Sequence, residues 1–146
     1  MKTLHNILHD QEQIKHAVST GVKTHAKLQK IVIDSDGAIG DAAIIKQILN
    51  HPHLVPFFAP CTQTEVPIAG YLNGRFVSRR IDRLCINHEQ KSVDIIDYKT
   101  DVNPDMYRDK YILQIREYIK LVQQIYPTYS VRGHLLWTHD FVLETV

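Results

Sequence analysis

The spacing of apolar positions divides the chain into a helical first part and a strand-rich second part. In the first part, apolar residues recur three or four positions apart over residues ~5–18 and ~20–32, which predicts two helices with a break at 19–21. A third helix is predicted over residues 41–50, because Asp41 stands near its start and Pro52 follows its end. Residues 51–60 are interrupted by prolines and predict an irregular connection.

From residue 64 onward the pattern changes to short runs of β-branched and aromatic residues, which favour strands. Three strands joined by hairpin turns are predicted first: 64–72, 76–86 and 92–99. A helix and two further strands follow: 106–126, 131–138 and 141–146. The helix carries one apolar stripe, made of Tyr111, Ile115, Tyr118, Val122 and Ile125. Its place between two strands makes it a natural crossover connection.

This order of elements predicts an α/β fold with a mixed sheet flanked by helices. A chain of 146 residues suits one domain, so we expect a single domain over 1–146. Its helical part covers about 1–50, and its sheet and crossover helix cover about 62–146.

Composition narrows the function only slightly. Lys and Arg number 17 against 16 Asp and Glu, so a nucleic-acid partner is not announced by net charge and has to be argued from a site. No apolar run approaches the ~20 residues of a membrane helix, and the first residues contain no apolar signal segment, so we expect a cytoplasmic protein with no membrane partner. Cys61 and Cys85 are expected to be reduced thiols.

The segment "VDIIDYK" places two charges on a strand that otherwise suits burial. Asp97 and Lys99 are two positions apart, so their side chains share one face of the strand. Asp82 lies in the preceding strand, and neighbouring strands are only about 4.8 Å apart, so both carboxylates can reach one cation. Mg²⁺ prefers such oxygen ligands, and Lys99 can orient water or neutralise a phosphate, which together predict a phosphodiester-hydrolysing site. An ordinary surface ion pair fits the same spacing equally well.

Several ordered segments of the chain resemble one nuclease family. The segments "IDRL" (81–84), "IIDYKTD" (95–101) and "LQIREY" (113–118) resemble the RecB/AddA-type nucleases of the PD-(D/E)XK superfamily. The match is nearest to the carboxy-terminal nuclease domain of AddA-type helicase–nucleases and extends over residues ~20–138, with "TGVKTHAKLQ" (20–29), "HPHLVPFFAPCTQTEVPIAG" (51–70) and "VRGHLLWT" (131–138) as further segments. This resemblance implies a restriction-endonuclease-like three-layer fold.

The resemblance also implies roles for residues around the predicted cation. Asp82 and Asp97 are then metal ligands and part of the catalytic site, with Lys99 as the catalytic lysine. His25 is a further metal ligand from the preceding helix, and the backbone carbonyl of Tyr98 completes the set. The arrangement requires that His25 and Asp82 lie on the same side of the sheet.

The long helix is implied to border the site and the path of DNA. Gln114 and Tyr118 lie four positions apart on one helix face, which Tyr111 and Tyr107 extend. Glu65 has the least defined role, which is metal binding, support of the ligands or structure alone. Simpler interpretations stay open for each, since the tyrosines also fit a core and Glu65 fits an ordinary strand.

Two departures from the family pattern affect the expected site. Ile81 replaces the proline of the superfamily's name, and Arg80 stands where glycine often precedes the acidic pair, which narrows the approach. Arg79, Arg80 and Arg83 either form a solvated strand edge, the preferred interpretation, or contact phosphates. No phosphate-binding loop of a helicase is present in these residues.

The resemblance thus implies a Mg²⁺-dependent deoxyribonuclease, with Mn²⁺ as a substitute, acting in double-strand break repair and recombination. Its expected partners are single-stranded DNA and a helicase domain or an AddB-like subunit. Exonuclease action is favoured by the resemblance, whereas the residues alone leave exo- and endonuclease cleavage open. The alternative is a nuclease-like module that binds DNA or docks a subunit without cutting.

Overall fold

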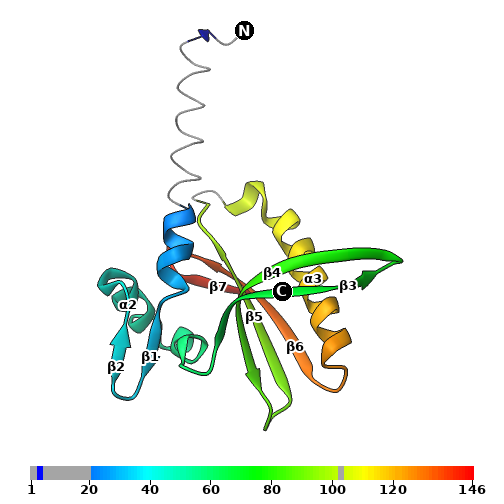
Figure 1. Ribbon diagram of the computed structural model, residues 1–146. Helices are drawn as coiled ribbons and strands as arrows, with labels where there is room; N and C mark the ends of the chain where they lie inside the picture. The colour runs from blue at the N-terminus through cyan, green and yellow to red at the C-terminus, as the bar shows by residue number, and fades with distance from the viewer. Residues whose placement is uncertain (1–2, 5–20, 102–103) are drawn as a thin grey trace.

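The chain forms an α/β fold with a mixed five-stranded sheet flanked by helices (Figure 1). This computed structural model describes residues 3–4, 21–101 and 104–146. The helix predicted over ~5–18 lies outside the described residues. The α/β class and the mixed sheet predicted from the apolar pattern are confirmed.

The sheet has the spatial order β3-β4-β5-β6-β7. Its strands are β3 (Gln63–Leu72), β4 (Arg75–Asn87), β5 (Ser92–Lys99), β6 (Ser130–Trp137) and β7 (Val142–Thr145). All neighbours are antiparallel except β5 and β6, which run parallel and are joined through the short helix η2 (Pro104–Met106) and the helix α3 (Arg108–Ile125). The predicted crossover is therefore confirmed.

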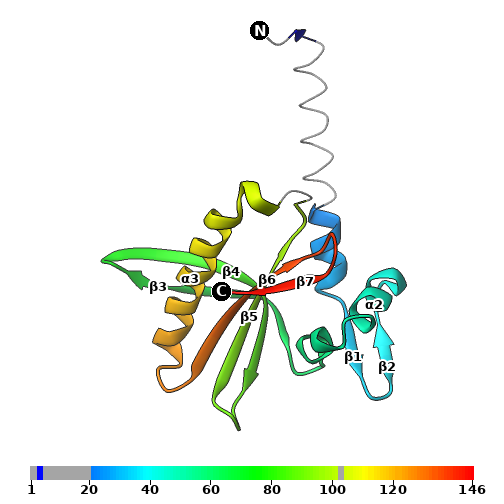
Figure 2. The same cartoon turned by 180° about the vertical axis from the view of Figure 1, so that it is seen from behind.

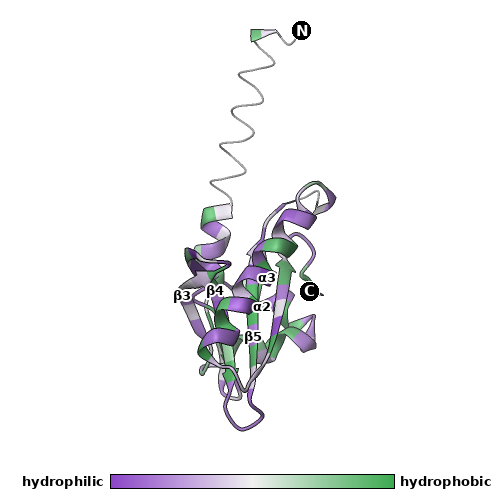
Figure 3. Ribbon diagram, turned by 90° about the vertical axis from the view of Figure 1, so that its right-hand side faces the viewer, coloured by the Kyte–Doolittle hydropathy of each residue, from purple (hydrophilic) through white to green (hydrophobic). Residues whose placement is uncertain are grey.

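Both faces of the sheet are covered. Helix α3 packs on one face, where its residues Ile115, Tyr118 and Leu121 meet strand residues such as Val93 and Ile95. The other face is covered by a helix over residues 21–28, by α2 (Ala42–Leu49) and by the 3₁₀ helix η1 (Pro52–Phe58) (Figures 1 and 2). Figure 3 shows hydrophobic residues along the central strands and hydrophilic residues in the turn between β4 and β5.

The first part of the chain differs from the sequence prediction beyond residue 28. The helix predicted over ~20–32 stops there, and a small hairpin of β1 (Val32–Asp34) and β2 (Gly37–Ile39) follows. Asp34 closes its turn, because its Oδ1 accepts hydrogen bonds from the backbone N–H groups of Asp36 and Gly37. The apolar run at 31–33 suits both a helix and a strand, so periodicity could not separate them.

Helix α2 begins as the sequence predicts. Asp41 is its N-cap, and the Asp41 carboxylate accepts a hydrogen bond from the N–H of Ile44 at 3.0 Å. Ile125, which the sequence pattern placed in the apolar stripe of α3, is 55% exposed at the last turn of the helix. Val22, one of the apolar positions behind the helix predicted over ~20–32, is 65% exposed at the first described turn.

Strand β4 changes its facing within its length. Val77 and Ile81 face α3 from odd positions, whereas Leu84 and Ile86 face α3 from even positions. The alternation therefore shifts by one residue between Ile81 and Leu84, although side chains of a regular strand alternate without interruption. As a result, Asp82 faces the same side of the sheet as the apolar residues under α3.

No helix within the described residues is long and apolar enough to cross a membrane.

Candidate active site

The predicted acidic pair lies where β4 and β5 come together. Arg83 pairs with Ile96 and Leu84 pairs with Ile95, so continuation of this register places Asp82 opposite Asp97. Directly opposite residues share a face. The two carboxyl groups lie within hydrogen-bonding reach of each other. The structure therefore brings together the two side chains that the sequence proposed as neighbours.

Asp82 connects β4 to β5 and to the helix over residues 21–28. Its Oδ2 accepts a hydrogen bond from the backbone N–H of Tyr98 at 2.8 Å, and the Nε2 atom of His25 lies 3.4 Å from the same oxygen. Burial opposes the charge on Asp82, but the hydrogen bonds from His25 and from the Tyr98 amide outweigh it and hold the pKa of Asp82 below its ordinary value. Asp82 is thus an ionised acceptor at neutral pH.

The ring of His25 is oriented from both sides. Its Nδ1 lies 2.9 Å from the carbonyl oxygen of Gly21, which can only accept, so Nδ1 carries a proton. Nε2 therefore faces Asp82, with a second N–H when the ring is protonated and with a lone pair when the ring is neutral. The hydrogen bond with Asp82 raises the pKa of His25 to about 9 despite partial burial, so without a cation the imidazole is protonated. The Tyr98 ring contacts the imidazole edge to face, at 5.5 Å between centroids.

Asp97 is the most deeply buried acid of the group, at 4% exposure. Burial and the charge of Asp82 raise its pKa well above the ordinary value, and Lys99 only partly offsets them. Lys99 Nζ lies 2.6 Å from Asp97 Oδ2, yet this oxygen has no hydrogen-bond partner of suitable geometry among the described residues. The contact is thus an ion pair that leaves a buried carboxylate oxygen incompletely satisfied.

Helix α3 supplies the remaining contacts of Lys99. The Nζ atom of Lys99 donates a hydrogen bond to Oε1 of Gln114 at 3.1 Å and lies 4.1 Å from the centre of the Tyr111 ring. Gln114 in turn donates through Nε2 to the hydroxyl oxygen of Tyr118 at 2.9 Å. Burial is the main reason that the pKa of Tyr118 and that of Tyr111 are raised, so both hydroxyls stay protonated. The ammonium group is therefore held by β5 and α3 together.

The helix tyrosines pack in the core and also contact two of the predicted site residues. Tyr118 is only 3% exposed and belongs to the core under α3, and Tyr111 packs against that core. The same two side chains contact Gln114 and Lys99 through the hydroxyl and the ring respectively. Tyr107 is 46% exposed and reaches the group only through its ring contact with Tyr111.

Glu65 stands apart from the acidic pair. Its register position is opposite Asp82, but it has a left-handed backbone conformation, with φ of 53°, and its pairing to β4 is interrupted there. Its carboxylate lies 3.6 Å from the guanidinium of Arg80. The structure thus gives Glu65 a place in the bend of β3, and a ligand role for it stays a prediction.

Arg83 contradicts both interpretations that the sequence offered for it. The side chain is 1% exposed, so it neither lines a solvated edge nor reaches a phosphate. Arg79 and Arg80 are exposed and form ion pairs with Glu117 and Glu65. The one-residue shift in β4 turns Arg83 away from α3 and into the core on the opposite face of the sheet, a change that no local sequence signal announces.

The donor chemistry of the group fits a hard divalent cation. Asp82 and Asp97 offer carboxylate oxygens, and Nε2 of His25 offers a nitrogen that Mn²⁺ accepts more readily than Mg²⁺. The Oδ2 atom of Asp97 is buried, contacts the Lys99 ammonium and has no hydrogen-bond partner of suitable geometry among the described residues. Within the described residues, no three His, Cys, Asp or Glu side chains form a closed cluster at metal-binding distances. The ammonium of Lys99 and the imidazolium of His25 neutralise the acids instead.

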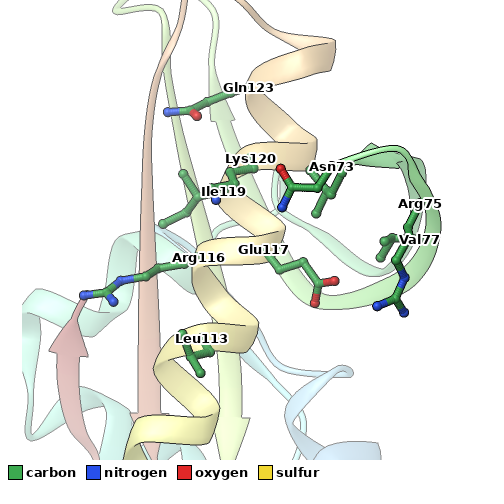
Figure 4. A pocket seen from close by; sticks show the side chains of 10 residues that line it. Asn73, Arg75, Val77, Leu113, Arg116, Glu117, Ile119, Lys120 and Gln123 are labelled. Atoms are coloured by element: carbon green, nitrogen blue, oxygen red, sulfur yellow. The ribbon is translucent and has the colours of Figure 1, made fainter.

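Two hollows lie near these residues. A cavity of about 240 Å³ opens beside the end of β5, lined among others by Asp101 and Trp137, whose neighbour across the strands is Lys99. A wider groove of about 620 Å³ lies between the β3–β4 turn and the outer face of α3, with Arg75 and Glu117 on its walls (Figure 4). None of the predicted site residues lines the wider groove.

Comparison with known proteins leaves the family undecided. No protein-family model and no curated protein matches the chain.

Proposed function

We propose that the chain is a metal-dependent DNA nuclease domain of the PD-(D/E)XK superfamily, with a restriction-endonuclease-like fold and RecB/AddA-type site residues. Its reaction is the hydrolysis of phosphodiester bonds, and its substrate is single-stranded DNA in double-strand break repair. The mixed sheet with elements on both faces is compatible with this fold. The proposal includes an association with a helicase domain or an AddB-like subunit.

One observation carries the proposal. Two carboxyls from adjacent strands, Asp82 and Asp97, lie within hydrogen-bonding reach, and a buried oxygen of Asp97 has no hydrogen-bond partner within the described residues. Close carboxylates repel unless a cation or a proton lies between them. Such an arrangement is costly for stability and is typical of functional sites.

The residues divide into a cation-holding set and a phosphate-facing set. Asp82, Asp97 and His25 would hold Mg²⁺ or Mn²⁺, with the carbonyl oxygen of Tyr98 as a further donor. Bound there, the cation supplies Lewis acidity toward the phosphodiester. Lys99 belongs to the second set, because its ammonium is the positive group of β5 that can neutralise a phosphate oxygen or orient the attacking water.

Gln114 and Tyr111 fix the place of that ammonium. A lysine side chain has four rotatable bonds, so a hydrogen bond at 3.1 Å and a ring at 4.1 Å restrict it to one position. During hydrolysis the water oxygen bonds to phosphorus and gives up a proton to solvent, the bond to the leaving oxygen breaks, and that oxygen takes up a proton from solvent. Lys99 keeps its proton, since its role is to offset negative charge that increases in the transition state.

The direct test is cleavage of end-labelled oligo(dT) with Mg²⁺, with Mn²⁺ and with EDTA. We expect cleavage only with the cations and a loss of about 10²-fold or more for Lys99→Ala and Asp97→Asn. Asp36→Asn is the matched control, because Asp36 is an exposed acid in the β1–β2 turn. A covalently closed circular single strand distinguishes exonuclease from endonuclease cleavage, because an exonuclease needs a free end and leaves the circle intact.

The alternative, a module that no longer cuts, has an equally clear signature. Such a protein binds oligo(dT) or a partner subunit, takes up no Mg²⁺ or Mn²⁺ at millimolar concentration by calorimetry, and yields no product. A wild type that cuts equally well in EDTA would also contradict the proposal.

A further inference from the structure

Arg83 is a buried arginine whose hydrogen bonds all go to neutral groups. Its Nε donates to the Tyr98 hydroxyl at 2.8 Å, and one terminal nitrogen donates to the carbonyl oxygens of Leu28 and Ile31 at 2.9 and 3.2 Å. The other terminal nitrogen donates to Thr62 Oγ1 at 2.7 Å and to the Phe57 carbonyl at 3.4 Å. These contacts engage all five N–H donors of the guanidinium.

The burial of this charge requires an explanation beyond packing. Arg83 is 1% exposed, and its guanidinium lies against the Leu28 carbonyl at the end of the helix over 21–28 and 4.4 Å from the centre of the Phe58 ring. Helix C-termini attract cations, which lowers the cost of burial. An apolar residue of equal volume is nevertheless often as stable in such a place, so stability alone does not account for an arginine.

Its neighbour in the chain shows what the arginine accomplishes. Asp82 and Arg83 are consecutive, they point to opposite faces of β4, and both contact the same two elements. Asp82 contacts His25 of the helix and the N–H of Tyr98 in β5. Arg83 contacts Leu28, one turn after His25, and the hydroxyl of the same Tyr98.

The two residues thus bind the helix over residues 21–28 and β5 from opposite faces of β4. The carbonyl of Leu28 lies three residues, about 4.5 Å along the axis, from His25. A guanidinium fixed to that carbonyl therefore limits how far the imidazole can move from Asp82. The Tyr98 ring, held by Arg83 at its hydroxyl, closes the arrangement by contacting the imidazole edge.

We propose that Arg83 is a positioning residue for the cation site, which holds the His25 helix and Tyr98 at the distance from Asp82 that a divalent cation requires. The inference rests on the proposed function for its cation and adds a residue that touches neither cation nor substrate. Residues that orient metal ligands in this way typically change metal affinity by about 10- to 100-fold when replaced.

The experiment compares Arg83→Lys with Ile48→Ala. Lysine keeps the charge but cannot reach partners on three elements at once. Ile48 is fully buried in the core on the same face of the sheet but belongs to α2, which provides none of the site residues, so its truncation should lower stability and leave the site in place. Both variants are first characterised by urea unfolding, and Mn²⁺ affinity is then measured on the folded proteins by calorimetry.

A second readout needs no cation. The nuclear Overhauser effect between the His25 and Tyr98 rings reports their contact in EDTA. We expect Arg83→Lys to bind Mn²⁺ about tenfold more weakly or worse and to lose this effect, while Ile48→Ala keeps both. Equal losses in the two variants would reduce Arg83 to a structural residue and overturn the inference, as would unchanged values in Arg83→Lys.

Failure of the proposed function has a different signature. If the wild type takes up no Mn²⁺, the proposed cation site is wrong. The contact between the His25 and Tyr98 rings is then the only test of the positioning role of Arg83. Loss of that contact in Arg83→Lys but not in Ile48→Ala then still supports the positioning role. Retention of the contact in both variants contradicts it.

Discussion

Lys99 and Gln114 are joined by a hydrogen bond of 3.1 Å that links the third strand of the sheet to the crossover helix. Through this bond, the way α3 packs on the sheet determines where the Lys99 ammonium lies in the candidate site. Gln114 also donates to Tyr118, so the amide is satisfied on both sides and fixes the ammonium against a buried, rigid partner.

Replacement of Gln114 should therefore lower catalysis more than stability. In Gln114→Leu, the ammonium loses an acceptor and the Tyr118 hydroxyl loses a donor. We expect kcat on oligo(dT) to fall about 10- to 100-fold, because small misplacements of a catalytic group have effects of that order, with about 1 kcal/mol lost in stability. Gln123→Leu on the exposed side of α3 is the control. An unchanged kcat in Gln114→Leu would show that Lys99 needs no such support.

Asp97→Asn should have opposite effects on stability with and without a divalent cation. The charge of Asp97 is disfavoured by burial and by Asp82, so the neutral isostere should raise the free energy of unfolding in EDTA at pH 8 by about 1 kcal/mol. The wild type should gain about 2.7 kcal/mol at a cation concentration 100 times Kd, and the variant should gain almost nothing. Urea unfolding in EDTA and in Mn²⁺ measures both. Equal stabilisation of the two proteins by Mn²⁺ would remove Asp97 from the ligand set.

A separate group of charges sets a dependence of stability on pH. Burial disfavours the charge on Asp94. The side chains of His134, 2.7 Å away, and Arg132, 3.1 Å away, outweigh this effect and hold the pKa of Asp94 below its ordinary value. An acid with a lowered pKa stabilises the fold above its unfolded value of about 3.9, and this contribution is lost as the pH falls through the folded value. The stability difference between the wild type and Asp94→Asn should be present at pH 6 and shrink below pH 4. A difference that grows on acidification would contradict this sign.

Helix α3 depends on a glycine beneath it. A Cβ at Gly133 of β6 would lie 2.2 Å from Cγ2 of Ile115 and 3.0 Å from Ile119. Gly133→Ala should therefore destabilise the protein by about 1–3 kcal/mol, as overpacking does in other cores. The double variant Gly133→Ala/Ile115→Ala should lose less than the sum of the single changes, because the second change makes room for the first. Strict additivity in thermal unfolding would mean that the helix shifts away instead.

Strong local signals account for the parts of the fold that the sequence predicted. The Asn73–Gly74 turn, the Asp41 cap and the long apolar stripe of α3 each depend on neighbouring residues only. The hairpin of β1 and β2 was missed, because the apolar residues before Asp34 suit either secondary structure and only its side-chain hydrogen bonds decide.

The candidate site was predictable only in part. The proximity of Asp82 and Asp97 follows from a short hairpin and a regular register. The contact of His25 with Asp82 depends on the docking of a helix more than fifty positions earlier, and the family resemblance alone suggested it. Arg83 was misplaced because alternation along β4 is interrupted, next to the point where Glu65 of β3 has a left-handed backbone and its pairing to β4 is broken.

The interruption in β4 also limits how this protein can be redesigned. In a strand with one uninterrupted alternation, only one of the consecutive residues Ile81 and Asp82 could face α3, whereas in β4 both do. Its two halves thus follow alternations that are offset by one residue, and the second half presents the Asp82 carboxylate to the helix side together with Leu84 and Ile86. Straightening the existing strand into one alternation would turn either Ile81 or the carboxylate of Asp82 to the opposite face, so the irregularity between Ile81 and Leu84 is the feature of β4 that a redesign has to keep.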